Sequence, residues 1–337
     1  MKFWSTLVLS AVLLSSQRDI LAAEAGSVAF PFLSMHYSAR EVSMAGASLG
    51  MPSGAGGVLW NPATTAFLTS PEAAAGYRGV VLDIGAAFAS YAIPTAGRGV
   101  WSVNVLDLSS GSVQDIQEGP DGGPFSTGVT WSANSFVGGV SWARAFVDNV
   151  AVGATLKGFY DRIGSDHTDH YTAAGFLADL GVQYRSRDAG LCAGASIRNA
   201  GFLATSYTPG FADLPLPWSV GAGISYVLPQ VRTLRVAADV QKINGQTLRL
   251  VPAVELTLLE RVLWLRCGYG FSSSDAREGI KVLAGSARQD YVKSSWDAFC
   301  AGAGFSSAEY GVNLSCDVAL EFREIAPALA VSVSYSY

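Results

Sequence analysis

The chain has 337 residues, of which 50% are hydrophobic and only 15% are charged, and its mean hydropathy is +0.29. Soluble proteins carry about 25% charged residues, so the composition argues against an ordinary soluble domain. The net charge of −5 and the pI near 5.2 argue against a nucleic-acid-binding protein, which would normally be basic.

Residues 1–25 are expected to form a signal peptide. Lys2 supplies the positive start, Leu7–Leu14 the apolar core, and Ala23-Glu24-Ala25 a small-residue cleavage site. The sequence therefore predicts export to the cell envelope or beyond.

The segment 26–71 follows, and its stretch from Phe30 to Ala63 is apolar and glycine-rich, with Arg40 and Glu41 as its only charged residues. So little polar surface does not suit a solvent-exposed loop. The stretch also contains no apolar run long enough for a membrane-crossing helix. We expect it to pack inside the rest of the protein, as a plug.

From Glu72 onward, short apolar segments with period-two alternation predict β-strands. In 149–163, for example, Val152, Ala154 and Leu156 fall on one face, and Thr155 and Lys157 on the other. Most segments have about the 9–11 residues that a tilted strand needs to cross a bilayer. We expect fourteen strands: 72–81, 83–93, 98–108, 134–146, 149–163, 170–185, 188–201, 217–228, 232–243, 247–259, 262–271, 296–306, 308–320 and 328–337.

The connections between these segments alternate in length: those after even segments are short, whereas most of those after odd segments are long. This asymmetry is typical of outer-membrane barrels, in which long loops face the exterior. The sequence thus predicts an all-β protein, with residues 72–337 forming a transmembrane antiparallel barrel of about fourteen strands in the bacterial outer membrane. Twelve or sixteen strands remain open, because Phe125–Ser132 could also pair.

Charged residues of both signs occupy the face opposite the apolar one. They are expected to form a polar network in the lumen, since charges at bilayer depth are costly unless they face inward and pair. The residues are Lys157, Asp179, Arg198, Arg235, Asp239, Arg249, Glu255 and Arg266. The network could line a ligand path or hold the N-terminal segment; the second alternative is favoured. Cys192 and Cys300 should share this inner face, and Cys267 and Cys316 the apolar one.

The N-terminal stretch, with Arg40, Met44-Ala45-Gly46-Ala47 and Trp60-Asn61-Pro62-Ala63, resembles the signature of the PorV/PorQ family of outer-membrane barrels. These are related to FadL-type transporters of hydrophobic compounds. Weaker matches are Val152–Lys157, Ala178–Gly181 and Ile197–Gly201. The resemblance assigns Asn61, Pro62 and Ala63 to a hatch inside the barrel. Pro52–Gly57 stands where family members usually carry an aspartate-containing tract.

Two functions are open. The resemblance favours a non-enzymatic component of type IX secretion with the translocon as a partner. It would bind the C-terminal signal domains of cargo proteins through outer loops 109–133, 202–216 and 272–295. The alternative is a FadL-like passive transporter with a hydrophobic ligand, or a detergent, in its lumen. No catalytic motif, metal motif or cofactor motif is visible, so we expect no enzyme activity and no cofactor. The expected partners include the outer-membrane lipid but no nucleic acid.

Overall fold

The computed structural model describes residues 28–337 apart from 82–83, 119–122, 166–169, 189, 208–214, 247, 260–261, 273–298 and 324–326. The expected signal peptide, residues 1–25, lies outside the described residues. No helix among those described is both long and apolar enough to cross a membrane.

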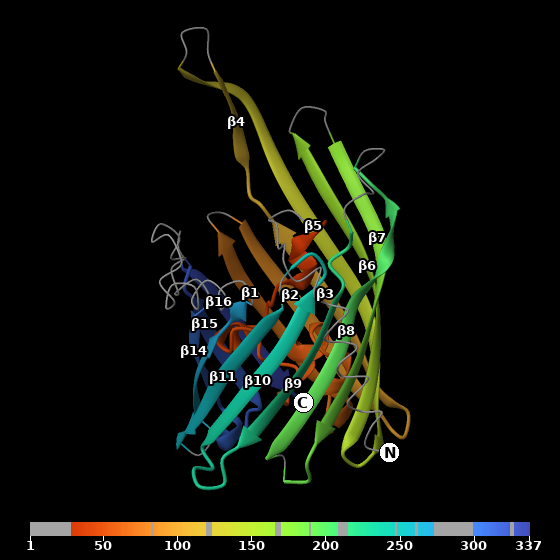
Figure 1. Ribbon diagram of the computed structural model, residues 1–337, viewed down its shortest axis with the longest axis vertical. Helices are drawn as coiled ribbons and strands as arrows, with labels where there is room; N and C mark the ends of the chain where they lie inside the picture. Colours follow the sequence, from red (N-terminus) through yellow and green to blue (C-terminus); the bar gives the residue numbers. More distant parts are fainter. Residues whose placement is uncertain are drawn as a thin grey trace, which may run out of the picture.

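Fourteen antiparallel strands form a closed barrel, as the sequence predicts (Figure 1). Each wall strand pairs with its neighbours in the chain, and β1 pairs with β16 to close the ring. Closure satisfies the backbone hydrogen bonds that lipid cannot. The wall strands are β1 (Glu72–Val81), β2 (Ile84–Thr95), β3 (Gly99–Ser109), β5 (Pro124–Val147), β6 (Val150–Ser165), β7 (His170–Arg185), β8 (Leu191–Thr205), β9 (Ser219–Val227), β10 (Leu234–Ile243), β11 (Arg249–Leu258), β12 (Leu263–Tyr269), β14 (Phe299–Ser306), β15 (Leu314–Glu321) and β16 (Ala328–Ser336).

The alternation of side chains along the strands separates a lipid-facing row from an inner row. In β6, Leu156 is 74% exposed, whereas its neighbours Thr155 and Lys157 are buried. Cys192 and Cys300 are likewise buried, whereas Cys316 is exposed. Because lipid is the solvent for the outer row, the exposed apolar side chains belong there.

One connection contains paired structure that the sequence had left open for Phe125–Ser132. Within the expected loop 109–133, β4 (Val113–Glu118) pairs with β5, which begins at Pro124 instead of near residue 134. The resulting hairpin rises far above the ring (Figure 1). A further short strand, β13 (Phe271–Ser272), pairs with β11.

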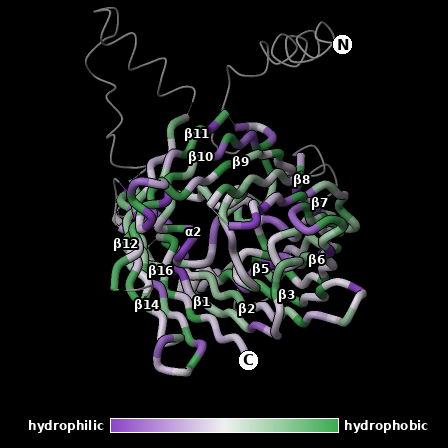
Figure 2. The backbone as a smooth tube through the Cα atoms, turned by 90° about the horizontal axis from the view of Figure 1, so that it is seen from below, coloured by the Kyte–Doolittle hydropathy of each residue, from purple (hydrophilic) through white to green (hydrophobic). Residues whose placement is uncertain are grey.

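The N-terminal segment consists of short helical turns joined by irregular chain. These are η1 (Pro31–Ser34), α2 (Ala39–Ser43), η2 (Ala55–Leu59) and η3 (Pro62–Phe67). A view along the barrel shows α2 within the ring of strands (Figure 2). Almost every residue from Val28 to Thr65 is buried or half-buried, so the segment packs against inner faces of the wall.

Candidate functional site

The Asn61-Pro62-Ala63 turn starts η3 and touches the wall. The Asn61 side chain accepts a hydrogen bond from the Ala63 amide (3.0 Å) and donates one to the Val182 carbonyl of β7 (3.2 Å). Pro62 suits the first helical position, since its missing amide hydrogen would have no partner there. Asn61 therefore both caps η3 and holds it against β7.

Inward-facing glycines let the N-terminal backbone approach the wall closely. A Cβ atom at Gly153 would lie 2.5 Å from the Ala63 nitrogen, and one at Gly181 would overlap the Asn61 side chain. The same is true of other inner positions, which face Leu49, Met44 and Ser43. We call this set the glycine belt: Gly153, Gly181, Gly194, Gly268 and Gly302. The predicted site residues did not include this set, although glycines at inner positions of alternating strands indicate close approach of another backbone.

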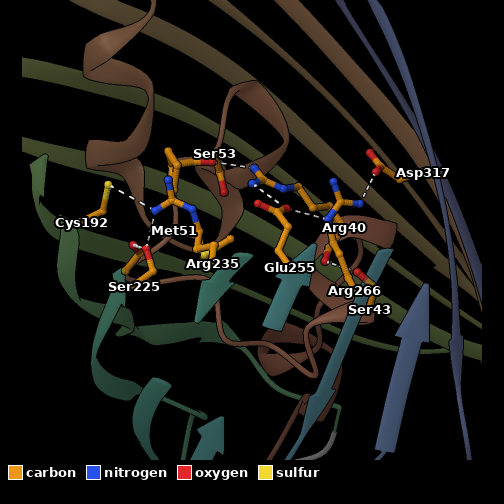
Figure 3. A network of polar contacts seen from close by, with 12 residues as sticks. Arg40, Ser43, Met51, Ser53, Cys192, Ser225, Arg235, Glu255, Arg266 and Asp317 are labelled. Carbon is orange, nitrogen blue, oxygen red and sulfur yellow. Dashed lines mark hydrogen bonds and ion pairs between the residues drawn. The ribbon is translucent and has the colours of Figure 1, made fainter. Parts of the chain in front are cut away.

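A buried ionic network joins the N-terminal segment to the opposite side of the barrel (Figure 3). The Glu255 carboxylate of β11 is 2.7 Å from Arg266 Nε and 3.2 Å from Arg40 Nη2. Arg266 also lies 2.5 Å from Asp317 of β15. The strand register aligns Glu255 with Arg266 on one side and with Arg235 on the other. The contribution of Arg40 was not foreseen.

Asn199 organises a second buried polar cluster. Lys157 of β6 contacts Asp179 of β7 and the Asn199 side-chain oxygen, each at 2.7 Å. The Asn199 side chain also donates to the Leu33 carbonyl (2.9 Å). Asn199 has a positive φ of 57° and lies where the β7–β8 register shifts. Asn tolerates that conformation better than most residues, which is a sequence signal that periodicity alone does not show.

The remaining residues of the expected polar network lie separately. Asp239 accepts hydrogen bonds from the Ser48 and Leu49 amides, both at 2.9 Å. Arg235 donates to Ser225 (3.0 Å) and to Cys192 Sγ (3.9 Å), as Figure 3 shows. Arg249 lies beside Gly270, at the end of β12.

Arg198 and Trp60, two further residues that the sequence singled out, stack together with His36. The Arg198 guanidinium lies 3.3 Å from the centre of the Trp60 ring, and the His36 ring lies 3.4 Å from it on centroids. Gly46, with a φ of 93°, lies directly against His36, so a side chain there would collide with the imidazole. Burial, together with Arg249, Arg198 and Arg78, lowers the pKa of His36 well below its usual value, so this imidazole is neutral.

The inner face is not polar throughout, contrary to the expectation of a polar lumen. Apolar side chains from five wall strands and from the N-terminal segment pack together inside the barrel. The Phe30 ring lies 4.8 Å from Phe159 and 5.9 Å from Tyr207, measured between centroids. We call this set the apolar cluster: Phe30, Phe32, Leu33, Phe88, Leu106, Val137, Phe159 and Leu177.

Comparison with solved structures identifies the same architecture. The Pseudomonas putida toluene transporter TodX aligns with a TM-score of 0.59 at 13% identity, over 89% of this chain and 97% of that one. The Ralstonia pickettii toluene transporter TbuX aligns with a TM-score of 0.58 at 10% identity, over 89% and 98%. No family model and no curated protein matches the sequence.

At identities this low the alignments show the fold alone, which is the closed antiparallel barrel of these two toluene transporters. The chain is accordingly a β-barrel of the bacterial outer membrane.

Proposed function

We propose that the protein is a passive, non-enzymatic outer-membrane channel for a small hydrophobic molecule, with residues 26–71 serving as its plug. The observation that supports this most is the apolar cluster, which places aromatic and aliphatic side chains on the inner wall next to the N-terminal segment. Ligand sites for apolar molecules are lined mainly by such side chains. The fold shared with two toluene transporters supports the same class of substrate.

The contacts suggest how a ligand would pass. Residues 29–37 meet the wall partly through apolar side chains, chiefly those of Phe30, Phe32 and Leu33, and an apolar ligand can replace these contacts at little cost in buried area. Segment 40–63 would stay in place and prevent leakage of polar solutes. The plug would then open only at its apolar end.

Irregular strand pairing in the wall supports release of the ligand sideways into the lipid. The β7–β8 register shifts between Ala178 and Leu180, two residues from Gly181, against which Asn61 packs. Among the described residues, which exclude 208–214, the β8–β9 ladder ends at the pair Arg198–Ser219, whereas β8 continues to Thr205. A bulge and a shortened ladder weaken the wall at this place.

The direct test is uptake of radiolabelled toluene by cells that lack their own hydrocarbon channels and produce this barrel. We expect faster uptake that a protonophore does not abolish, because no energy source is involved. Uptake equal to that of cells producing an unrelated porin at the same level would contradict the proposal.

The secretion role suggested by the sequence resemblance gains no support from the toluene transporters. Of its three expected binding loops, 272–295 lies almost wholly outside the described residues. A pull-down from native membranes separates the two functions. Co-purified translocon subunits or cargo would favour secretion, whereas a growth defect on a hydrophobic nutrient with normal secretion would favour the channel.

A further inference from the structure

A small polar cavity lies between the N-terminal segment and the wall strands β1, β2, β15 and β16. Its volume is about 80 Å³. A water molecule takes up about 30 Å³ in the liquid, so the cavity is large enough for an ion with one or two waters. The lining residues that matter here are Ser38, Arg40, Glu41, Glu72, Asp317 and Ser334.

The lining carries three carboxylates and one guanidinium, and all but one of these groups are already engaged. Arg40 contacts Glu255 and donates to the Pro52 carbonyl (2.6 Å). Asp317 is paired with Arg266, and Glu72 accepts a hydrogen bond from the Ala55 amide (2.7 Å). The remaining group is the carboxylate of Glu41.

Glu41 is buried without a partner. The residue is only 5% exposed, and within the described part of the chain no hydrogen bond or ion pair reaches its carboxylate. The nearest influential positive charges, Arg40 and Arg198, act on it only through space. A buried, ionised carboxylate without a partner is costly, so Glu41 either binds a proton or has a further positive group beside it.

We propose that this cavity binds a monovalent cation, either an alkali ion or an ammonium group, beside the Glu41 carboxylate. With all groups ionised, the four charged lining residues sum to −2, which favours a cation and excludes a carboxylate-bearing ligand. The hydroxyl groups of Ser38 and Ser334 add the neutral oxygen ligands that such ions accept. No group of three or more acidic, His or Cys side chains suited to a metal ion occurs among the described residues, which disfavours a divalent ion.

The role of this cation site differs from the passage of substrate proposed above. A cation there would connect α2 with the β1 and β15 walls, and would thereby stabilise the packed position of segment 40–63. Cation concentration would set how firmly this part of the segment is held.

The test is thermal unfolding of the full-length protein in nanodiscs, with K⁺, Na⁺ or ammonium replaced by bulky choline at constant ionic strength. Burial raises the pKa of Glu41 to about 8. In choline, the Glu41 carboxyl of the folded protein keeps its proton up to about pH 8, whereas that of the unfolded chain loses it above about pH 4.5. The stability of the folded state therefore falls as the pH rises from about 4.5 to about 8. At pH 9 we expect a small cation to raise the melting temperature by about 3 °C, and to do so much less at pH 6, where the proton competes.

Glu41→Gln should abolish the response of the melting temperature to the cation. The control is Glu309→Gln, which removes an exposed carboxylate in the turn before β15 and should keep the response. If Glu41→Gln fails to fold, Ser334→Ala should still fold and show a weaker response. Comparison of K⁺ with methylammonium distinguishes a bare ion from an ammonium group. Stability that depends on pH but not on the cation would show that a proton alone neutralises Glu41, and would overturn the proposal, as would an unchanged response in Glu41→Gln.

Discussion

The N-terminal segment meets the barrel wall through two regions of different chemistry. Segment 40–63 lies directly against the glycine belt and joins the Arg40–Glu255–Arg266 network. Residues 29–37 instead pack Phe30, Phe32 and Leu33 into the apolar cluster. The first region depends on close approach and on buried charges, and the second mainly on apolar area, beside hydrogen bonds that Asn199 and Arg78 donate to the Leu33 and His36 carbonyls.

These two kinds of contact determine which end of the N-terminal segment can move. Contacts with glycine backbones are specific in register, and breaking a buried ion pair leaves an uncompensated charge. Apolar contacts are non-directional, so another apolar molecule can replace them. We therefore expect a hydrophobic ligand to displace residues 29–37 and to leave segment 40–63 in place.

The largest effect is expected for Glu255→Ala. The substitution leaves Arg40 and Arg266 without their shared acceptor, and removing one partner of a buried ion pair costs about 3–5 kcal/mol. Thermal unfolding in nanodiscs should show a lower transition temperature, together with leakage of hydrophilic antibiotics into cells. Normal leakage and stability would mean that the network does not hold the segment.

Phe30→Ala should act mainly on the other region. It removes the ring that contacts Phe159 and Tyr207, at a cost of about 3 kcal/mol to local packing. Toluene uptake should rise several-fold without antibiotic leakage. The control is Phe202→Ala, whose ring is 64% exposed on the barrel; an equal change in that variant would remove the distinction between the two regions.

Gly153→Val tests the glycine belt. The added side chain would collide with Pro62 and Ala63, and overpacking of this kind costs about 1–3 kcal/mol. We expect leakage of hydrophilic antibiotics, because segment 40–63 can no longer lie against β6. Gly158→Val in the same strand is the matched control, since a Cβ atom there meets only Phe176 carbons at 3.9 Å or more. Similar leakage from both variants would contradict a specific role for Gly153.

Asn61→Ala should have the smallest effect. It removes the cap on the Ala63 amide and the bond to Val182, which together are worth about 1–2 kcal/mol. Hydrogen exchange of residues 62–67 should accelerate while the rest of segment 40–63 stays protected. Asn61→Asp keeps the cap and should recover part of the protection; a failure to do so would assign the effect to the Val182 bond.

Much of the barrel could be predicted from the sequence, because lipid imposes a strict alternation on strands that cross it. Leu156 and Lys157 show it within two neighbouring residues. The alternation gave fourteen strands and the faces of Cys192 and Cys316. It left Pro124–Ala133 of β5 undecided, because this part belongs to a hairpin beyond the ring and no lipid acts on it.

The interior was harder to predict, because its contacts join residues far apart in the chain. Glu255 and Arg266 lie on adjacent strands, whereas the contact of Glu255 with Arg40 depends on how the N-terminal segment folds back. The apolar cluster was missed for a related reason. An inner row was expected to be polar, whereas Phe88 and Phe159 face a protein segment and not water.

The most direct test of the two-region account is hydrogen exchange of the N-terminal segment in nanodiscs, with and without toluene. The account predicts that amides in segment 40–63 stay protected in both conditions, whereas those of residues 29–37 exchange faster when toluene is present. Equal exchange in the two regions, or loss of protection across segment 40–63 on adding toluene, would contradict it.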